Sequence, residues 1–160
     1  MEIKISSIIK EELFHVDVDP FRDKEELFDT CARWLAEENV VKDIQQLKEA
    51  LYHRESIGST YLGNYIALPH AKGVSVEYSS VLFCRTKSPF MYQSNDEEGE
   101  VKYIFMLIIP ENETNDGYIH MLASIAKLLT MDEFTSKLDG FKNAEDFINC
   151  ALEVREGEEL

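Results

Sequence analysis

Residues 102–109 read K-Y-I-F-M-L-I-I, and this stretch decides the fold class. Its apolar run from Ile104 to Ile109 has no polar residue at alternate positions, which predicts a strand buried on both faces. Such a strand lies in the interior of a sheet whose two faces are both covered. We therefore expect residues 102–109 to form a central strand.

Two further segments predict strands of the same sheet. Residues 80–86, S-V-L-F-C-R-T, are rich in β-branched and aromatic residues. Residues 65–68 are short and apolar, and Pro69 is expected to end them because proline donates no hydrogen bond to a neighbouring strand. Residues 93–100 are polar and predict a loop. Its acidic run, Asp96-Glu97-Glu98 with Glu100, is typical of solvated chain and would also help to steer a basic partner.

Helical periodicity fills most of the remaining chain. Apolar residues recur at helical spacing in residues 23–39, and Asp43 can cap a second helix that ends near His53. A third helix is expected after Gly117, a short one in residues 132–138, and a last one that Asn143 caps before a frayed tail at residues 156–160. Helices and strands alternate, which predicts a layered α/β fold. At 160 residues the chain predicts one domain, residues 1–160 with a core of about 3–154, but the pattern does not give the strand order.

The charge balance argues against some partners. Sixteen basic residues against thirty-one acidic ones give a net charge of −15, a poor basis for binding nucleic acid or an anionic membrane. Residues 51–90 are the exception. Their charged side chains are Arg54, Lys72, Arg85 and Lys87 against Glu55 and Glu77. This mildly basic stretch invites a search for an anion site, although chance in a window of that length explains it equally well.

We expect a soluble cytoplasmic protein. The longest apolar run is far shorter than the roughly 18–20 residues that a membrane-spanning helix needs, and the N-terminal residues do not resemble a signal peptide. Cys31, Cys84 and Cys150 are widely spaced and odd in number, as reduced packing residues of an intracellular protein would be.

Residues 54–72, R-E-S-I-G-S-T-Y-L-G-N-Y-I-A-L-P-H-A-K, carry the candidate chemistry. His70 is expected where the chain leaves the sheet after Pro69, a frequent location of catalytic groups. Near pH 7 a histidine is mostly neutral imidazole, which is a nitrogen nucleophile. The segment also offers donors for the oxygens of a phosphoryl group: Arg54, Ser59, Thr60 and backbone N–H groups near Gly63. A lone histidine after a strand is more often structural, and on the residues alone that reading stays open.

The same segment resembles the signature of the enzyme IIA component of the bacterial sugar phosphotransferase system, in the fructose/mannitol class. That signature has an Arg-Glu pair, a Thr-x-x-Gly segment and an apolar-Ala-apolar-Pro-His end. They correspond here to Arg54-Glu55, residues 60–63 and residues 66–70. The Gly63-Asn64 step before the Pro-His end is the more specific part, and the resemblance covers most of the chain.

The resemblance implies a phosphotransferase with a mixed β-sheet flanked by helices. His70 would accept a phosphoryl group from the phosphocarrier protein HPr and donate it to an enzyme IIB partner, while the membrane component, enzyme IIC, carries the sugar. Arg54 and His120 would stabilise the transferred charge beside His70. Thr60 would donate a hydrogen bond to the phosphate, and Ser59, Gly63 and Asn64 would line its site. No metal and no organic cofactor are implied.

The sequence departs from the family pattern at two positions. Tyr65 stands where many members have glycine, which would narrow the approach to His70, and Tyr92 stands where tryptophan is common. Glu55 would orient Arg54 or a histidine, or would be exposed. His15 and His53 are expected to be structural.

Two other functions compete with sugar uptake. A regulatory module of the nitrogen-related branch would share the phosphorylated histidine, and its phosphorylation state would control binding to other proteins. A metal-dependent hydrolase would use His70 and His120 as metal ligands, although the four histidines lack zinc-ligand spacing. The sugar, with a preference for fructose or a sugar alcohol, cannot be read from this chain. Nor can the oligomeric state, or whether the chain is free-standing or part of a fusion.

Overall fold

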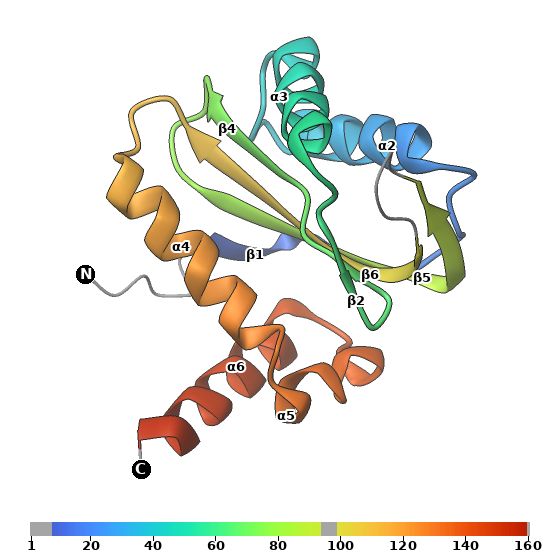
Figure 1. The fold of residues 1–160 in the computed structure, drawn as a ribbon, viewed down its shortest axis with the longest axis vertical. Coiled ribbons are helices and arrows are strands. Elements are labelled where there is room, and N and C mark those ends of the chain that lie inside the picture. Colours follow the sequence, from blue (N-terminus) through green and yellow to red (C-terminus); the bar gives the residue numbers. More distant parts are fainter. Residues whose placement is uncertain (1–7, 94–98, 160) are drawn as a thin grey trace.

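The computed structural model describes residues 8–93 and 99–159, with side chains up to residue 154. One sheet lies between two groups of helices (Figure 1). The elements follow in the order β1 (Ile9–Val18), α2 (Lys24–Glu37), α3 (Ile44–Ile57), β2 (Tyr61–Gly63), β3 (Ile66–Ala67), β4 (His70–Val74), β5 (Ser80–Tyr92), β6 (Gly99–Pro110), α4 (Asn115–Leu128), α5 (Asp132–Thr135), the 3₁₀ helix η1 (Leu138–Gly140) and α6 (Ala144–Glu159).

The sheet is mixed, and β6 lies in its interior as residues 102–109 predicted. The strand order is β1-β5-β6-β3-β2, and β4 also pairs with β6. The central pair β5 and β6 is antiparallel, whereas β1 runs parallel to β5 and both β3 and β4 run parallel to β6. The predicted α/β class with a mixed sheet flanked by helices is therefore confirmed.

Alternate residues of β6 face two separate cores. Ile104 and Met106 pack with the residues under α2 and α3, while Phe105 and Leu107 pack with those under α4 and α6. All four are fully buried. Burial of an apolar side chain of this size contributes about 1.5–3 kcal/mol, which explains why this strand is apolar on both faces. Figure 1 shows α2 and α3 on one side of the sheet and α4, α5 and α6 on the other.

Side-chain caps set the helix starts. Asp23, Asp43, Thr114 and Asn143 each accept a hydrogen bond from the backbone N–H three residues later, at 2.9–3.0 Å. Three were predicted as helix starts or caps, but the Thr114 cap begins α4 before Gly117. The second and last helices also run further than predicted, because α3 continues to Ile57 and α6 to Glu159. The longer α3 brings Arg54 and Glu55 onto the helix.

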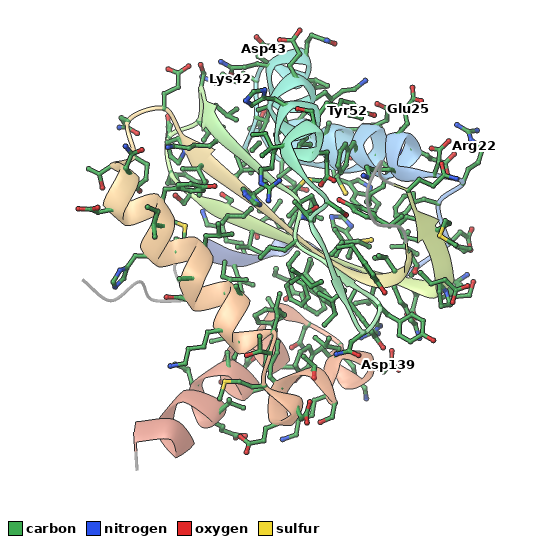
Figure 2. The ribbon with its side chains drawn as sticks, in the orientation of Figure 1. Arg22, Glu25, Lys42, Asp43, Tyr52 and Asp139 are labelled. Atoms are coloured by element: carbon green, nitrogen blue, oxygen red, sulfur yellow. The ribbon has the colours of Figure 1, made fainter. Side chains whose placement is uncertain are left out.

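Contacts between α2 and α3 fix the end of α3 over the sheet. The Tyr52 ring of α3 meets Phe28 of α2 edge-on at 5.2 Å, and Lys48 Nζ lies 2.6 Å from Asp29 Oδ1. Figure 2 shows Tyr52 and Glu25 on the same side of this helical layer. Burial, together with nearby carboxylates, raises the pKa of Tyr52 to about 12, so its hydroxyl stays neutral.

The chain does not leave the sheet after Pro69, and this part of the prediction was wrong. Leu107 N donates to Pro69 O at 3.0 Å, and His70 then begins β4, directly opposite Leu107 of β6. Pro69 is tolerated because it lies between β3 and β4, two short strands that both pair with β6, where no ladder hydrogen bond from its nitrogen is needed. The His70 side chain therefore projects from the first residue of a paired strand, β4, rather than from a loop after the sheet.

Two other segments differ from expectation. Strand β1 was not predicted, because its sequence I-K-E-E-L-F-H-V-D-V mixes acidic and apolar residues. In the predicted loop at residues 93–100, Gly99 and Glu100 belong to β6, and the acidic residues 96–98 lie outside the described residues. Among the helices described, none has the length and apolar character needed to cross a membrane.

Candidate functional site

The His70 ring is held at both nitrogens. The side chain is buried, with 4% of the residue exposed, and Nδ1 lies 3.0 Å from Leu68 O. Arg54 Nε donates to Nε2 at 3.1 Å. Since a carbonyl only accepts and a guanidinium only donates, we assign the proton to Nδ1 and the lone pair to Nε2. The nitrogen whose lone pair is available for attack is therefore Nε2.

The surroundings keep this imidazole neutral. Burial lowers the pKa of His70, and the positive charge of Arg54 lowers it further. The hydrogen bond to Leu68 and the Glu55 carboxylate act in the opposite direction, but burial is the largest effect. A neutral imidazole with a fixed lone pair is suited to nucleophilic attack at neutral pH.

Arg54 comes from the last turn of α3. Besides its bond to His70, it donates through Nη1 to Gly58 O at 2.8 Å. A cation is favoured there because the helix C-terminus carries partial negative charge. The predicted pairing of Arg54 with His70 thus has a geometric basis, although the two residues stand 16 positions apart in the sequence.

Glu55, the next residue of α3, anchors the helix end through a buried network. Its carboxylate lies 3.0 Å from Lys24 Nζ, and these two side chains are only 7% and 11% exposed. Tyr92 donates to Oε1 at 2.8 Å, and the Thr60 hydroxyl donates to the same oxygen. Of the alternatives predicted for Glu55, exposure is wrong. The carboxylate instead ties α2, α3 and β5 together immediately behind Arg54.

Thr60 thus acquires a role different from the one expected, and Tyr92 shares its carboxylate partner. Thr60 is 3% exposed and its hydroxyl is directed to Glu55, so the structure does not support the predicted hydrogen bond to phosphate. The Tyr92 hydroxyl also lies 2.8 Å from Thr60 Oγ1, and Lys24 Nζ is 4.4 Å from the ring centroid. Burial holds the pKa of Tyr92 well above its usual range, so the phenol is a neutral donor.

The predicted phosphate-lining residues separate along the hairpin of β2 and β3. Leu68 N donates to Thr60 O, which aligns residues 58–60 with residues 68–70 and puts Ser59 beside the site. Ser59 Oγ accepts from Tyr61 N at 3.1 Å. Gly63 and Asn64, by contrast, form the turn of the hairpin. Gly63 pairs with Ile66, which stands four residues before His70, so the turn lies at least about 13 Å from His70 along the edge at the usual rise per residue. The structure does not bring these two residues to His70.

The hairpin also explains why glycine is favoured at position 65, where this chain has tyrosine. Asn64 and Tyr65 form its two-residue loop with φ of 51° and 66°, and Gly63 has φ of 84°. Two consecutive positive φ values are what a type I′ hairpin turn requires, and glycine adopts them most easily. The glycine common at position 65 therefore answers a backbone requirement, which Tyr65 meets at some cost.

On the α4 side, the residue beside His70 is Tyr118. Its ring centroid lies 6.0 Å from that of His70, and Lys72 Nζ lies 4.7 Å from the Tyr118 ring. His120 is exposed, and its backbone oxygen accepts a hydrogen bond from the Ser124 hydroxyl. Side chains two positions apart on a helix point about 160° away from each other, so Tyr118 and His120 cannot both face His70.

The role of His120 was predicted from the resemblance to the family, whereas the ring of α4 that lies beside His70 is that of Tyr118. Gly117, Met121 and Ile125 are buried and mark the inward face of α4. Tyr118 adjoins that face and His120 does not. The periodicity of the helix was the signal that could have found Tyr118.

The other histidines lie apart from this site. His15 of β1 stacks on Trp34 with ring centroids 3.9 Å apart, and His53 on α3 is exposed. Within the described residues, no group of three histidine, cysteine or carboxylate side chains is arranged to hold a metal ion. A hydrolase with His70 and His120 as metal ligands has no site here, because the two side chains do not face each other.

The chain also matches the model of a known protein family over most of its length. The model of the family described as "Phosphoenolpyruvate-dependent sugar phosphotransferase system, EIIA 2" matches residues 7–153. Among curated proteins, a nitrogen regulatory protein homolog of Haemophilus influenzae is 33% identical over 147 residues, covering 90% of this chain and 88% of that protein. The fructose-specific EIIABC component of Bacillus subtilis is 29% identical over 136 residues, which are 85% of this chain. The chain spans only about a fifth of the length of that protein and of a second EIIABC component.

Solved structures agree with the fold. The nitrogen regulatory protein IIA-Ntr of Neisseria meningitidis superposes with a TM-score of 0.78 at 26% identity, covering 92% of this chain and 98% of that one. The mannitol enzyme IIA of Escherichia coli, solved in complex with phosphorylated enzyme IIB, gives a TM-score of 0.66 at 18% identity, covering 91% and 99%.

Proposed function

The chain belongs to the EIIA 2 family of the phosphoenolpyruvate-dependent sugar phosphotransferase system, and from this premise we propose that it is a phosphoryl carrier working through His70. His70 Nε2 accepts a phosphoryl group from phosphorylated HPr and donates it to a second protein, an enzyme IIB. The observation that carries this proposal is the neutral, buried imidazole whose Nε2 lone pair faces the Arg54 guanidinium.

Each transfer exchanges one P–N bond for another. Nε2 attacks the phosphorus, an Nε2–P bond forms, and the bond to the donor nitrogen of HPr breaks. The His70 ring then carries positive charge, which its Nδ1–H shares with Leu68 O. No proton has to leave the ring, because the same charge is released when the phosphoryl group moves on.

Arg54 has a different task before and after transfer. In the unphosphorylated protein its Nε–H donates to Nε2 and holds the ring in place. The lone pair that accepts this bond is the one that attacks, so Arg54 must turn its N–H groups to the phosphoryl oxygens as the new bond forms. Charge-assisted hydrogen bonds to those oxygens stabilise the transferred group.

Intact mass after incubation with phosphoenolpyruvate, enzyme I and HPr tests the proposal. We expect one acid-labile phosphoryl group on the wild-type protein and none on His70→Ala. His120→Ala is the matched control and should be phosphorylated normally, because its side chain is exposed on the outer side of α4. Phosphate uptake by His70→Ala would overturn the proposal.

The acceptor decides between uptake and regulation. An enzyme IIB is favoured by the family and by the mannitol enzyme IIA solved with its phosphorylated enzyme IIB, and fructose or a sugar alcohol remains the predicted cargo. A second candidate function is regulation by phosphorylation state. It is favoured by the similarity to nitrogen regulatory proteins over nearly their whole length.

Phosphoryl transfer from the purified protein separates these two candidates. Uptake predicts rapid loss of phosphate from phosphorylated protein when a fructose- or mannitol-type enzyme IIB is added. Regulation predicts that the phosphate stays on His70 under the same conditions. Because HPr is a cytoplasmic protein, both candidates operate in the cytoplasm.

A further inference from the structure

Two side chains on the α4 side of His70, Lys72 and Tyr118, have no part in the transfer as proposed so far. Lys72 stands two residues after His70 in β4, so both side chains project from the same face of the strand. Lys72 Nζ donates to Asn115 Oδ1 at 2.6 Å and lies 4.7 Å from the Tyr118 ring. Asn115 and Tyr118 both belong to the first turn of α4, and the Tyr118 ring that holds the ammonium group also neighbours the His70 ring, 6.0 Å away between centroids.

The partners of Lys72 are neutral, which is unusual in so acidic a chain. Lys24, Lys48 and Lys102 lie 2.6–3.0 Å from carboxylate oxygens. The described contacts of Lys72 are instead an amide oxygen and an aromatic face. Its positive charge is consequently not cancelled by a bonded carboxylate, and an anion near His70 would find it available.

The two cations approach His70 from different elements. Arg54 belongs to α3, whereas Lys72 of β4 contacts α4 through Asn115 and Tyr118. Figure 1 shows these two helices on either side of the edge that carries β4. A phosphoryl group on Nε2 presents three oxygens, and donors on one side cannot reach all of them. A second cation on the α4 side would complete the set.

We propose that Lys72 binds the phosphoryl group on His70 from the α4 side, and that Tyr118 and Asn115 position its ammonium. This inference rests on the proposed function of His70. It replaces the expected second histidine by a lysine that donates and an aromatic ring that fixes the lysine. Tyr118 is a positioning residue through its ring face, so its hydroxyl takes no part in proton transfer.

A chemical donor tests the proposal without any protein partner. In phosphoramidate the P–N bond breaks, ammonia leaves and the phosphoryl group forms a bond to the attacking imidazole. Its use on the whole chain, with His70→Ala as background, makes the result independent of HPr. Failure of HPr to phosphorylate the protein would count against the proposed function and would leave this test intact.

The decisive readout is the pKa of the phosphoryl group on His70, followed by its ³¹P chemical shift against pH. A nearby ammonium favours the dianion, so Lys72→Met should raise that pKa by about one pH unit or more. Lys142→Met, an exposed lysine before α6, is the matched control and should leave it unchanged. A purely structural role of Lys72 would not move this value.

Rates give the second readout. Loss of one charge-assisted contact should slow phosphorylation of Lys72→Met by about 10- to 100-fold, and Lys72→Arg should recover part of the rate. Tyr118→Phe keeps the ring and should stay within about twofold of wild type. A Lys72→Met protein with wild-type rate and an unshifted phosphoryl pKa would overturn the proposal. A large loss in Tyr118→Phe would overturn the role given to the ring.

Discussion

The two sides of His70 are built differently. On the α3 side, Arg54 stands in front of a buried network in which Glu55 is satisfied by Lys24, Thr60 and Tyr92. On the α4 side, Lys72 is exposed and rests on an amide and an aromatic ring. The buried side fixes His70, the proposed nucleophile, whereas the exposed side keeps a charge that, in our proposal, turns to an incoming phosphoryl group. The rigid part of the site thus lies at the end of α3, and the accessible charge lies next to α4.

The largest expected effect lies in the buried network. Glu55→Gln leaves the Lys24 ammonium buried without its counter-ion, which should lower the free energy of unfolding by about 3–5 kcal/mol. Urea unfolding measures this loss. Glu37→Gln is the matched control, because the Arg33–Glu37 pair is exposed and should contribute less than about 1 kcal/mol.

The double variant Lys24→Met with Glu55→Gln sharpens the same comparison. It removes both charges and should recover a substantial part of the stability lost by Glu55→Gln alone, because no buried charge remains unpaired. Equal stability of the single and double variants would show that Tyr92 and Thr60, rather than the ion pair, account for the loss.

Arg54 should matter more to phosphoryl transfer than Lys72. Arg54→Met removes both the hydrogen bond that holds Nε2 and a cation facing the phosphoryl oxygens, and should lower the transfer rate by about 100- to 1000-fold. Initial rates of phosphorylation measure the effect, with Arg33→Met on the exposed face of α2 as the control. A smaller loss in Arg54→Met than in Lys72→Met would reverse the division between the two sides.

These residues also mark how far the sequence could lead. The continuous apolar run in β6 and the caps at Asp23 and Asp43 are local signals, and they predicted a central strand and two helix starts. Arg54 and His70 were paired through their resemblance to a family signature. In contrast, β1 forms by parallel pairing with β5, more than sixty residues away, and its own residues carry little strand pattern.

The same distinction explains the errors at the site. The partner of Thr60 is Glu55 because α3 runs one turn beyond the predicted helix end near His53. The local sequence pattern did not give the position of that end. Tyr118 was missed because the second histidine was carried over from the family resemblance, although His120 lies off the buried face of α4. Residue chemistry and the family resemblance singled out His70, but only the helix geometry identified its neighbours.

The pH dependence of His70 should respond to the α3 side alone. Burial and Arg54 lower the pKa of the ring, so the neutral, reactive form persists as pH falls through 6.5, and the transfer rate declines only below that pH. Arg54→Met removes the neighbouring charge and should raise the pKa, so that the decline begins at higher pH. Lys72→Met should leave the midpoint where it is.

Ring-proton NMR of the unphosphorylated protein follows this titration directly. Burial is the larger cause, so the pKa in Arg54→Met should rise toward 6.5 without reaching it. A lower midpoint in Arg54→Met would contradict the electrostatic explanation. A shift in Lys72→Met as large as that in Arg54→Met would remove the contrast between the two sides.

The smallest effect is expected at the turn of the hairpin, outside both sides. Tyr65→Gly relieves a positive φ that costs an L-residue about 1–2 kcal/mol, while glycine loses about 0.5–1 kcal/mol through its greater freedom in the unfolded chain. The free energy of unfolding should therefore rise by about 0.5–1 kcal/mol. Asn64→Gly is the matched control with a smaller gain, because asparagine tolerates this conformation. The rate of phosphoryl transfer should not change, since the turn lies at least about 13 Å from His70 along the edge. A faster Tyr65→Gly protein would mean that the Tyr65 ring does obstruct the approach to His70, as the sequence predicted.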